Sequence, residues 1–194
     1  MKRGTSFNRD NVIRDAERLP AGGYVVRIIN AKEETFDWGS RLAIAFDIEE
    51  GEYKGFYKRN FDAQQSEDKK WKGTYRLNIP KEDGSKEDEW TQKKFNTVMV
   101  NIEESNPGFY FDWDESKLKG KLIGVLFNNK EWSINGKTGF FTNPHSIVTV
   151  ETIRSGKFTV PADTLLSGSK ASAPTTDSNG FMALPSGAEE EIPF

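Results

Sequence analysis

The chain has 194 residues, which suffices for one domain of ordinary size with a further segment attached. It has no cysteine and one histidine, His145, so disulfide bonds, thiolate catalysis and cysteine-ligated metal sites are excluded. The net charge is −3, no apolar run approaches the roughly 18 residues that cross a bilayer, and Lys2 and Arg3 precede polar residues instead of a signal-peptide core. We therefore expect a cytoplasmic protein.

The first 62 residues are predicted to form one helix and three strands. Residues 8–19 place apolar side chains near one helical face, and Pro20 would end that helix. Residues 24–31 are rich in β-branched side chains and predict a first strand. A second strand is predicted over residues 41–49, because apolar and polar side chains alternate there, and a third over residues 56–62. These three strands would form a meander.

The next part is predicted to form a helix and two more strands. Residues 89–104 carry apolar side chains at helical spacing, with Asp88 as the expected N-cap and the turn at residues 105–108 as the end. Strands are predicted over residues 121–127 and 147–153. Between them, residues 132–141 would form a hairpin that turns at Asn135-Gly136.

The resulting order predicts a mainly β fold, the five-stranded OB barrel with a helix between strands three and four. In that fold the helix closes one end of the barrel, and ligands bind on strands two and three and the flanking loops. A different small barrel, or a sandwich with one helix, would give nearly the same order of elements. The residues on the expected binding face are therefore stronger evidence for the OB fold than the order of elements.

Basic and aromatic residues interleave on that expected face. Residues 54–76 contain seven Lys and Arg against three Asp and Glu. Proteins that hold single-stranded nucleic acid without reading its sequence combine aromatic rings that stack on bases with cations that bind phosphates. We predict such contacts for Trp38, Lys54, Tyr57, Lys58, Arg59, Lys69, Lys70, Trp71, Lys72, Tyr75, Arg76, Lys130, Trp132 and Lys137.

Trp38, Tyr57, Trp71 and Trp132 are the predicted base-stacking residues, because each combines a flat ring with a polar edge. The competing interpretation is that these rings fill the barrel, and strand alternation implies that about half of the aromatic residues do so. Phe46, Phe95 and Phe127 lie on predicted apolar faces and are assigned to the core.

The C-terminal part of the chain differs in composition from the rest. Residues 1–160 contain 26 Lys and Arg against 25 Asp and Glu, whereas residues 161–194 contain one Lys against five acidic residues. Residues 167–187 are mostly small and polar, which predicts a disordered linker. We therefore divide the chain into a DNA-binding OB domain over residues 1–160 and a linker with an acidic tail over residues 161–194.

The tail ends in an apolar anchor behind an acidic run, namely Glu189, Glu190, Glu191, Ile192, Pro193 and Phe194. A terminal ring and its carboxylate suit a partner that offers an apolar pocket with a basic rim. This ending resembles that of the bacterial single-stranded DNA-binding proteins, which end in an acidic run followed by Ile-Pro-Phe.

Segments 19–24, 51–55 and 118–121 are in turn similar to a family of small replication-module proteins encoded by phages. The two resemblances together imply a phage-encoded single-stranded DNA-binding protein that acts in DNA replication, recombination and repair in the cytoplasm of a bacterial host. They imply no enzymatic activity and no cofactor. The partners implied for the tail are replication or recombination proteins of the helicase, primase, polymerase or recombinase class. A homo-oligomer is compatible with the sequence, but the bacterial tetramer is not carried over, since the body of the chain does not match.

Two other functions compete with this prediction. A protein–protein adaptor would share the tail but would not bind single-stranded DNA through its barrel. A metal-dependent nuclease would need clustered carboxylates, for which Asp47, Glu49 and Asp62 are the candidates. Alternating acidic residues on a strand more often form its solvated face.

Overall fold

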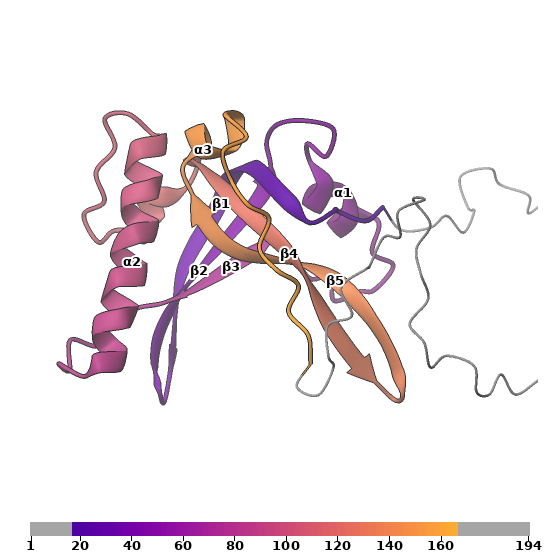
Figure 1. The fold of residues 1–194 in the computed structure, drawn as a ribbon, viewed down its shortest axis with the longest axis horizontal. Helices are drawn as coiled ribbons and strands as arrows, with labels where there is room; N and C mark the ends of the chain where they lie inside the picture. Colours follow the sequence, from indigo (N-terminus) through magenta and orange to yellow (C-terminus); the bar gives the residue numbers. More distant parts are fainter. Residues whose placement is uncertain (1–16, 167–194) are drawn as a thin grey trace, which may run out of the picture.

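Five antiparallel strands form one sheet in the computed structural model, which describes residues 17–166 (Figure 1). Three α-helices and one short 3-10 helix accompany the sheet. In chain order the elements are β1 Gly22–Phe36, β2 Gly39–Ile48, α1 Phe56–Asp62, β3 Thr74–Asn78, α2 Lys86–Ser105, η1 Glu115–Leu118, β4 Leu122–Ile134, β5 Lys137–Val148 and α3 Val150–Arg154. Most of the helix predicted over residues 8–19 precedes residue 17 and lies outside the described residues, as does the part of the tail after residue 166.

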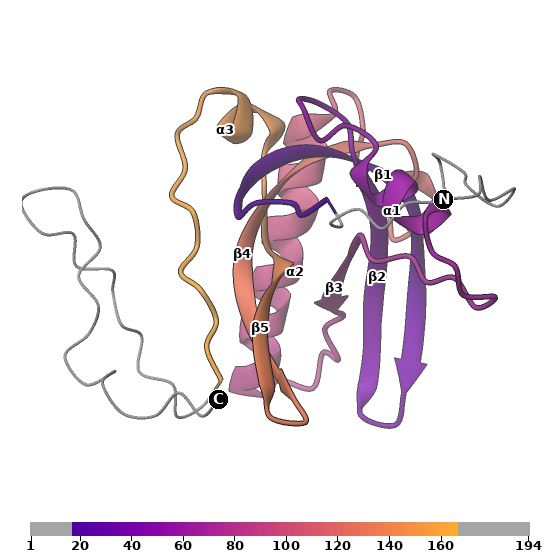
Figure 2. The same cartoon turned by 90° about the vertical axis from the view of Figure 1, so that its right-hand side faces the viewer.

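Two long hairpins dominate the sheet, whose strand order is β3-β2-β1-β4-β5. The β1–β2 and β4–β5 hairpins point their tips toward the same end of the molecule, and β3 lies between them in projection (Figure 2). The predicted turn of the β4–β5 hairpin is confirmed: Asn135 and Gly136 both have positive φ, 53° and 74°. Two successive positive φ values give the type I′ turn that suits the twist of paired strands.

The core contains the side chains that the apolar patterns predicted. On β2, Leu42, Ile44, Phe46 and Ile48 are all at most 2% exposed, as the alternation required. Helix α2 buries Phe95, Val98, Met99 and Ile102, which confirms the helical spacing. Its N-cap is Ser85 and not Asp88: the Ser85 hydroxyl accepts a hydrogen bond from Asp88 N at 3.1 Å. The helix therefore begins three residues earlier than predicted.

The third strand was predicted at the wrong place. Residues 56–62 form helix α1, and the strand that pairs with β2 is Thr74–Asn78. The Asp47 carboxylate on β2 accepts hydrogen bonds from the main-chain N–H groups of Tyr57 at 2.8 Å and Lys58 at 3.1 Å. Asp47 thus caps the first turn of α1 from a different element, a contact that local periodicity does not reveal.

The last strand was also misplaced. Strand β5 begins at Lys137 inside the predicted hairpin and ends at Val148, and most of residues 147–153 belong to helix α3. Thr149 is the N-cap of α3, because its hydroxyl accepts a hydrogen bond from Thr152 N at 3.2 Å. The β-branched residues of this segment had suggested a strand, but the cap and the following turn at Gly156, where φ is 68°, define a short helix.

Residues 162–164, just after the predicted domain boundary, are bound to β4. Thr164 forms a parallel bridge with Lys130 on β4. Lys130 lies beyond the part of β4, Leu122 to Phe127, that pairs with β1. The buried side chain of Asn128 fixes this segment, since its Nδ2 donates to Ala162 O at 2.8 Å and to Thr164 Oγ1 at 2.9 Å. Residues 162–164 therefore lie beside the outer half of β4.

Candidate nucleic-acid interface

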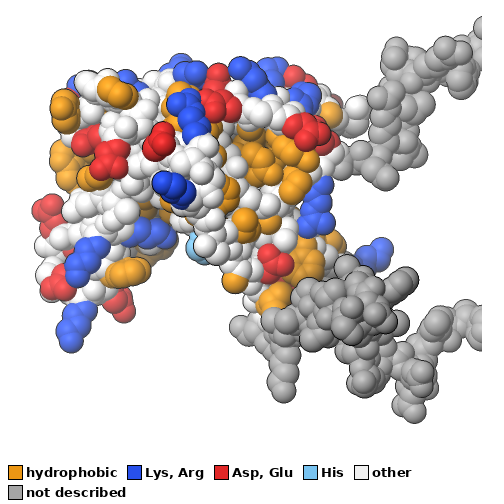
Figure 3. Space-filling model, turned by 45° about the horizontal axis from the view of Figure 1, so that its top comes forward, with side chains coloured by type: hydrophobic (Ala, Val, Ile, Leu, Met, Phe, Trp, Pro, Cys, Tyr) orange, Lys and Arg blue, Asp and Glu red, His pale blue; other side chains and the backbone are white. Residues whose placement is uncertain are grey.

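A groove of about 700 Å³ lies between α1, β3 and β5. Residues from four separate parts of the chain meet in it, including the N-terminal segment that precedes β1. They are Glu17, Arg18, Leu19, Phe56, Tyr57, Asn60, Trp71, Lys72, Thr74, Arg76, Phe140, Phe141, Thr142, Asn143 and Pro144. Figure 3 shows one face of the molecule, on which hydrophobic side chains are exposed between basic and acidic ones.

The charges that line the groove are mainly positive. Arg18, Lys72 and Arg76 contribute three cations from the N-terminal segment, the loop before β3 and β3 itself. Among the described residues that line the groove, Glu17 is the one carboxylate. Its charge is engaged by Arg59, whose Nη2 donates to the two carboxylate oxygens at 3.1 and 3.0 Å. The groove therefore presents a surface suited to an anionic chain.

Three aromatic rings border the groove without being fully buried. Phe140 and Phe141 on β5 are 41% and 45% exposed. Trp71 is half-buried, and its Nε1 donates to Phe46 O at 3.2 Å and to Gly73 O at 3.0 Å. These two hydrogen bonds fix the orientation of the indole. Rings of this kind offer flat faces on which nucleic-acid bases can stack.

The position of Trp71 follows from a close approach of two main chains. Gly73 O accepts a hydrogen bond from Phe46 N at 2.8 Å. A Cβ atom at Gly73 would lie 2.5 Å from Phe46 O and 2.7 Å from the Tyr57 ring. Glycine is therefore required for this approach, which brings the loop against β2 and places Trp71 at the groove.

Two of the predicted contact residues belong to the core. Tyr57 and Tyr75 are 6% and 4% exposed, so the prediction of base contacts for them is corrected. Tyr57 packs edge-on against Phe46, and burial raises the pKa of its phenol far above the ordinary value. The N–H group of Tyr57 is bound by Asp47, which turns the ring inward as the floor of the groove. Of the predicted residues, Tyr57, Trp71, Lys72 and Arg76 line the groove itself.

Four further predicted cations lie around α1 and the loop after it. Lys54 pairs with Glu49 at 3.3 Å, Lys58 with Asp62 at 2.5 Å, and Lys70 with Asp68 at 3.4 Å. Lys69 lies over the Phe61 ring at 5.9 Å. These side chains lie outside the groove lining, and intramolecular carboxylates offset part of the positive charge that the sequence places here.

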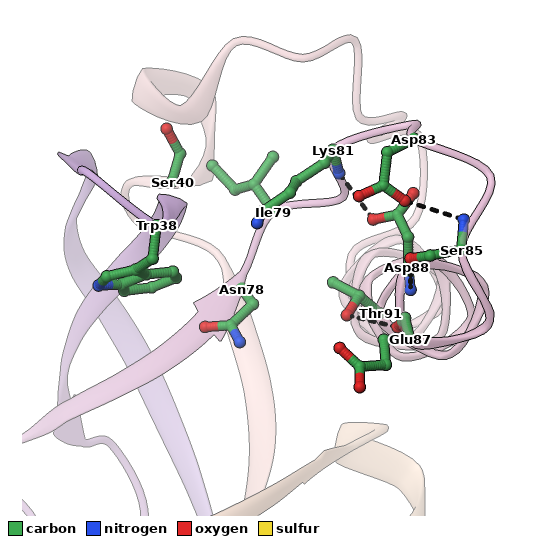
Figure 4. A pocket seen from close by; sticks show the side chains of 10 residues that line it. All are labelled: Trp38, Ser40, Asn78, Ile79, Lys81, Asp83, Ser85, Glu87, Asp88 and Thr91. Carbon is green, nitrogen blue, oxygen red and sulfur yellow. Dashed lines mark hydrogen bonds between the residues drawn. The ribbon is translucent and has the colours of Figure 1, made fainter.

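The predicted aromatic residues of the two hairpins lie away from the groove. Trp38 stacks on Phe36 with ring centroids 5.1 Å apart, and Arg41 covers the Phe36 ring at 4.6 Å. Trp38 borders a second cavity of about 180 Å³ beside the start of α2 (Figure 4). That cavity is lined by Asp83, Glu87 and Asp88, so it does not suit a phosphate.

On the other hairpin, Trp132 lies over Gly139, where a Cβ would come within 2.9 Å of the indole nitrogen. Lys130 and Lys137 belong to this same β4–β5 hairpin, and Lys137 directly follows its turn. The structure therefore does not bring Trp132, Lys130 or Lys137 into the groove lining.

Several groove residues were not predicted as contacts. Arg18, Asn60, Phe141 and Asn143 come from segments that the sequence assigned to other elements or left between elements. Phe140 lies in the hairpin predicted over residues 132–141, but it is not among the predicted contact residues. The adjacent Phe140 and Phe141 could have indicated an exposed aromatic side chain, because a strand that alternates between two faces cannot bury both of them on one face.

The carboxylates considered for a nuclease do not converge. Asp47 caps α1, Glu49 binds Arg27 and Lys54, and Asp62 binds Lys58. The hydrogen bond from Arg27, followed by that from Lys54, lowers the pKa of Glu49, although burial opposes the shift. Within residues 17–166 there is no group of three or more His, Asp or Glu side chains placed to hold a metal ion.

No protein-family model matches the chain, and no curated protein sequence matches it. Within the part of the chain that the structure describes, no helix is both long and apolar enough to cross a membrane.

Proposed function

We propose that the chain is a non-enzymatic protein that binds single-stranded DNA in the groove between α1, β3 and β5, without sequence preference. The observation that carries the proposal is the meeting of Trp71, Phe140 and Phe141 with Arg18, Lys72 and Arg76 around one groove. Rings serve unpaired bases and cations serve phosphates, and single-stranded binding needs both on one surface. In a duplex the bases are stacked on each other, so these rings would have no partner.

An OB-type barrel is the architecture that we propose for the sheet. Its two edge strands are β3 and β5, and some of their Cα atoms approach within 8 Å without a hydrogen-bonded ladder. Helix α2 lies between β3 and β4 in the chain, as the helix of an OB fold does. The groove then lies where the barrel remains open, next to strands two and three.

We further propose that the tail recruits replication or recombination proteins of a bacterial host through Glu189–Phe194. The support is the resemblance of this tip to that of the bacterial single-stranded DNA-binding proteins. Residues 162–164, which Asn128 binds beside β4, lie outside the groove lining. A synthetic peptide of the last nine residues should bind a host protein that recognises the bacterial tip, and the same peptide with Phe194→Ala should not.

A mobility-shift assay in EDTA tests the DNA-binding proposal against its alternatives. Labelled oligothymidine should shift, and a blunt duplex of equal length should bind much more weakly. An adaptor would shift neither probe. Incubation of both probes with Mg²⁺ or Mn²⁺ should leave them intact, and shortening of either would support a nuclease.

A further inference from the structure

One ion pair at the mouth of the groove joins a lining carboxylate to a cation on α1. Arg59 Nη2 donates to both carboxylate oxygens of Glu17, at 3.1 and 3.0 Å. The other terminal nitrogen, Nη1, donates to the main-chain carbonyl of Lys54. The two side chains are about half exposed, 49% for Arg59 and 48% for Glu17.

Glu17 is held in this position by the segment that follows it. Leu19 is 2% exposed, and its carbonyl accepts a hydrogen bond from the Thr142 hydroxyl on β5. The next carbonyl, that of Pro20, accepts from the Tyr24 hydroxyl at 3.0 Å. Residues 17–19 therefore connect the α1 side of the groove to its β5 side, and the Glu17 carboxylate is fixed where an anionic chain would enter.

The geometry of this pair makes it replaceable. Both oxygens of Glu17 share one nitrogen of Arg59, whereas the strongest arginine–carboxylate pairs use two parallel N–H···O bonds. Half-exposed ion pairs also contribute little to stability. A backbone phosphodiester offers two non-bridging acceptor oxygens and suits a guanidinium whose orientation is already fixed, here by the Lys54 carbonyl.

We propose that Arg59 is a phosphate-binding residue of the groove and that Glu17 occupies it in the free protein. A single strand would displace the Glu17 carboxylate and place one of its phosphates on Arg59. This inference rests on the proposed single-stranded DNA binding and adds a regulated subsite to it. A phosphate thus takes the place of the Glu17 carboxylate on Arg59. A neutral or weakly anionic ligand would not displace this carboxylate.

A double-mutant cycle with Glu17→Gln and Arg59→Gln tests the proposal in the full-length chain. Glu17→Gln should tighten oligothymidine binding at low salt by about two- to fivefold, the range expected for losing a competing exposed ion pair. Arg59→Gln should weaken binding and reduce the slope of log K against log salt by about 0.7, the value for one lost phosphate contact. In the Arg59→Gln background, Glu17→Gln should have no further effect.

The matched control is the ion pair between Glu50 and Arg154, which has similar exposure and lies outside the groove lining. Glu50→Gln should leave affinity unchanged. An equal gain from Glu17→Gln with and without Arg59 would show general charge repulsion and would overturn the subsite. The subsite would also be overturned if Glu17→Gln alone left the affinity for oligothymidine unchanged. Absence of oligothymidine binding by every variant, wild type included, would instead overturn the proposed function itself. Thermal unfolding of each variant establishes that it is folded, and Arg59→Met, which keeps the apolar stem but removes the charge, replaces Arg59→Gln if the latter does not fold.

Discussion

The indole of Trp71 donates a hydrogen bond to the main-chain carbonyl of Phe46 at 3.2 Å, which ties a ring at the edge of the groove to strand β2. Phe46 is fully buried, so this anchor belongs to the rigid part of the domain. A base that stacks on Trp71 would meet a ring whose orientation is already set. Little side-chain entropy is then lost on binding.

Replacing Trp71 should therefore weaken DNA binding strongly. For Trp71→Ala we expect a loss of about 1–3 kcal/mol in oligothymidine binding, the usual contribution of one stacked base. Fluorescence anisotropy of a labelled oligonucleotide measures this loss. Trp90→Ala is the control, because Trp90 is 71% exposed on α2 and outside the groove lining. Equal losses from both variants would remove Trp71 from the site.

Phe140 should contribute to binding more than to folding. Because its ring is 41% exposed, Phe140→Ala should change the free energy of unfolding by less than about 1 kcal/mol while weakening oligothymidine binding by about 1–3 kcal/mol. Ile134→Ala near the turn of the same hairpin removes an exposed apolar side chain outside the groove lining and should leave binding intact. A parallel loss of stability and affinity in Phe140→Ala would indicate a structural role only.

The two cations on the β3 side should determine part of the salt dependence. Lys72→Gln and Arg76→Gln should each reduce the slope of log K against log salt by about 0.7. The measurement is a set of binding titrations at increasing NaCl concentration. Lys137→Gln, beside the hairpin turn, should leave the slope unchanged. A reduction by Lys137→Gln equal to the others would extend the binding surface to the hairpin tip.

The ion pairs of Glu49 should make stability depend on pH in the acid range. The hydrogen bonds from Arg27 and Lys54 lower the pKa of Glu49 in the folded protein. A carboxylate with a lowered folded pKa stabilises the fold above its unfolded pKa, and the contribution is lost as pH falls through the folded pKa. Wild type should therefore melt above Glu49→Gln at about pH 7, and the difference should shrink as pH falls through the lowered folded pKa of Glu49.

The control for that comparison is Glu52→Gln, which removes a carboxylate with no ion pair within the described residues. Its melting temperature should follow that of wild type across the same pH range. If the Glu49→Gln difference persisted unchanged in acid, the pair with Arg27 would not be its source.

The elements with regular patterns were predictable from the sequence. The alternation on β2, the helical spacing on α2 and the Asn135-Gly136 turn each reflect contacts within one element or one hairpin. Helix α1 was not predictable in this way, because its cap, Asp47, comes from a strand nine residues before the helix begins. Helix α3 was likewise not predicted, because the β-branched residues around its N-cap, Thr149, favoured a strand.

The groove was predicted only in part for a related reason. Residues 71–76 carry a local signal of mixed basic and aromatic side chains, and four of them line the groove. The opposite wall, Phe140 to Pro144, and the crossing segment Glu17 to Leu19 come from distant parts of the chain. They reach the groove because β5 and β3 are the two edges of the sheet, a fact of topology that no local pattern carries.

The most direct measurement is a titration of the full-length chain with oligothymidine, followed by tryptophan fluorescence across a range of salt concentrations. Saturable quenching is expected, with a slope of log K against log salt of about −2 or steeper, since Arg18, Lys72 and Arg76 each contribute about 0.7. A blunt duplex of equal length should compete poorly. No quenching and no shift with oligothymidine, or equal affinity for the duplex, would contradict single-stranded binding in this groove.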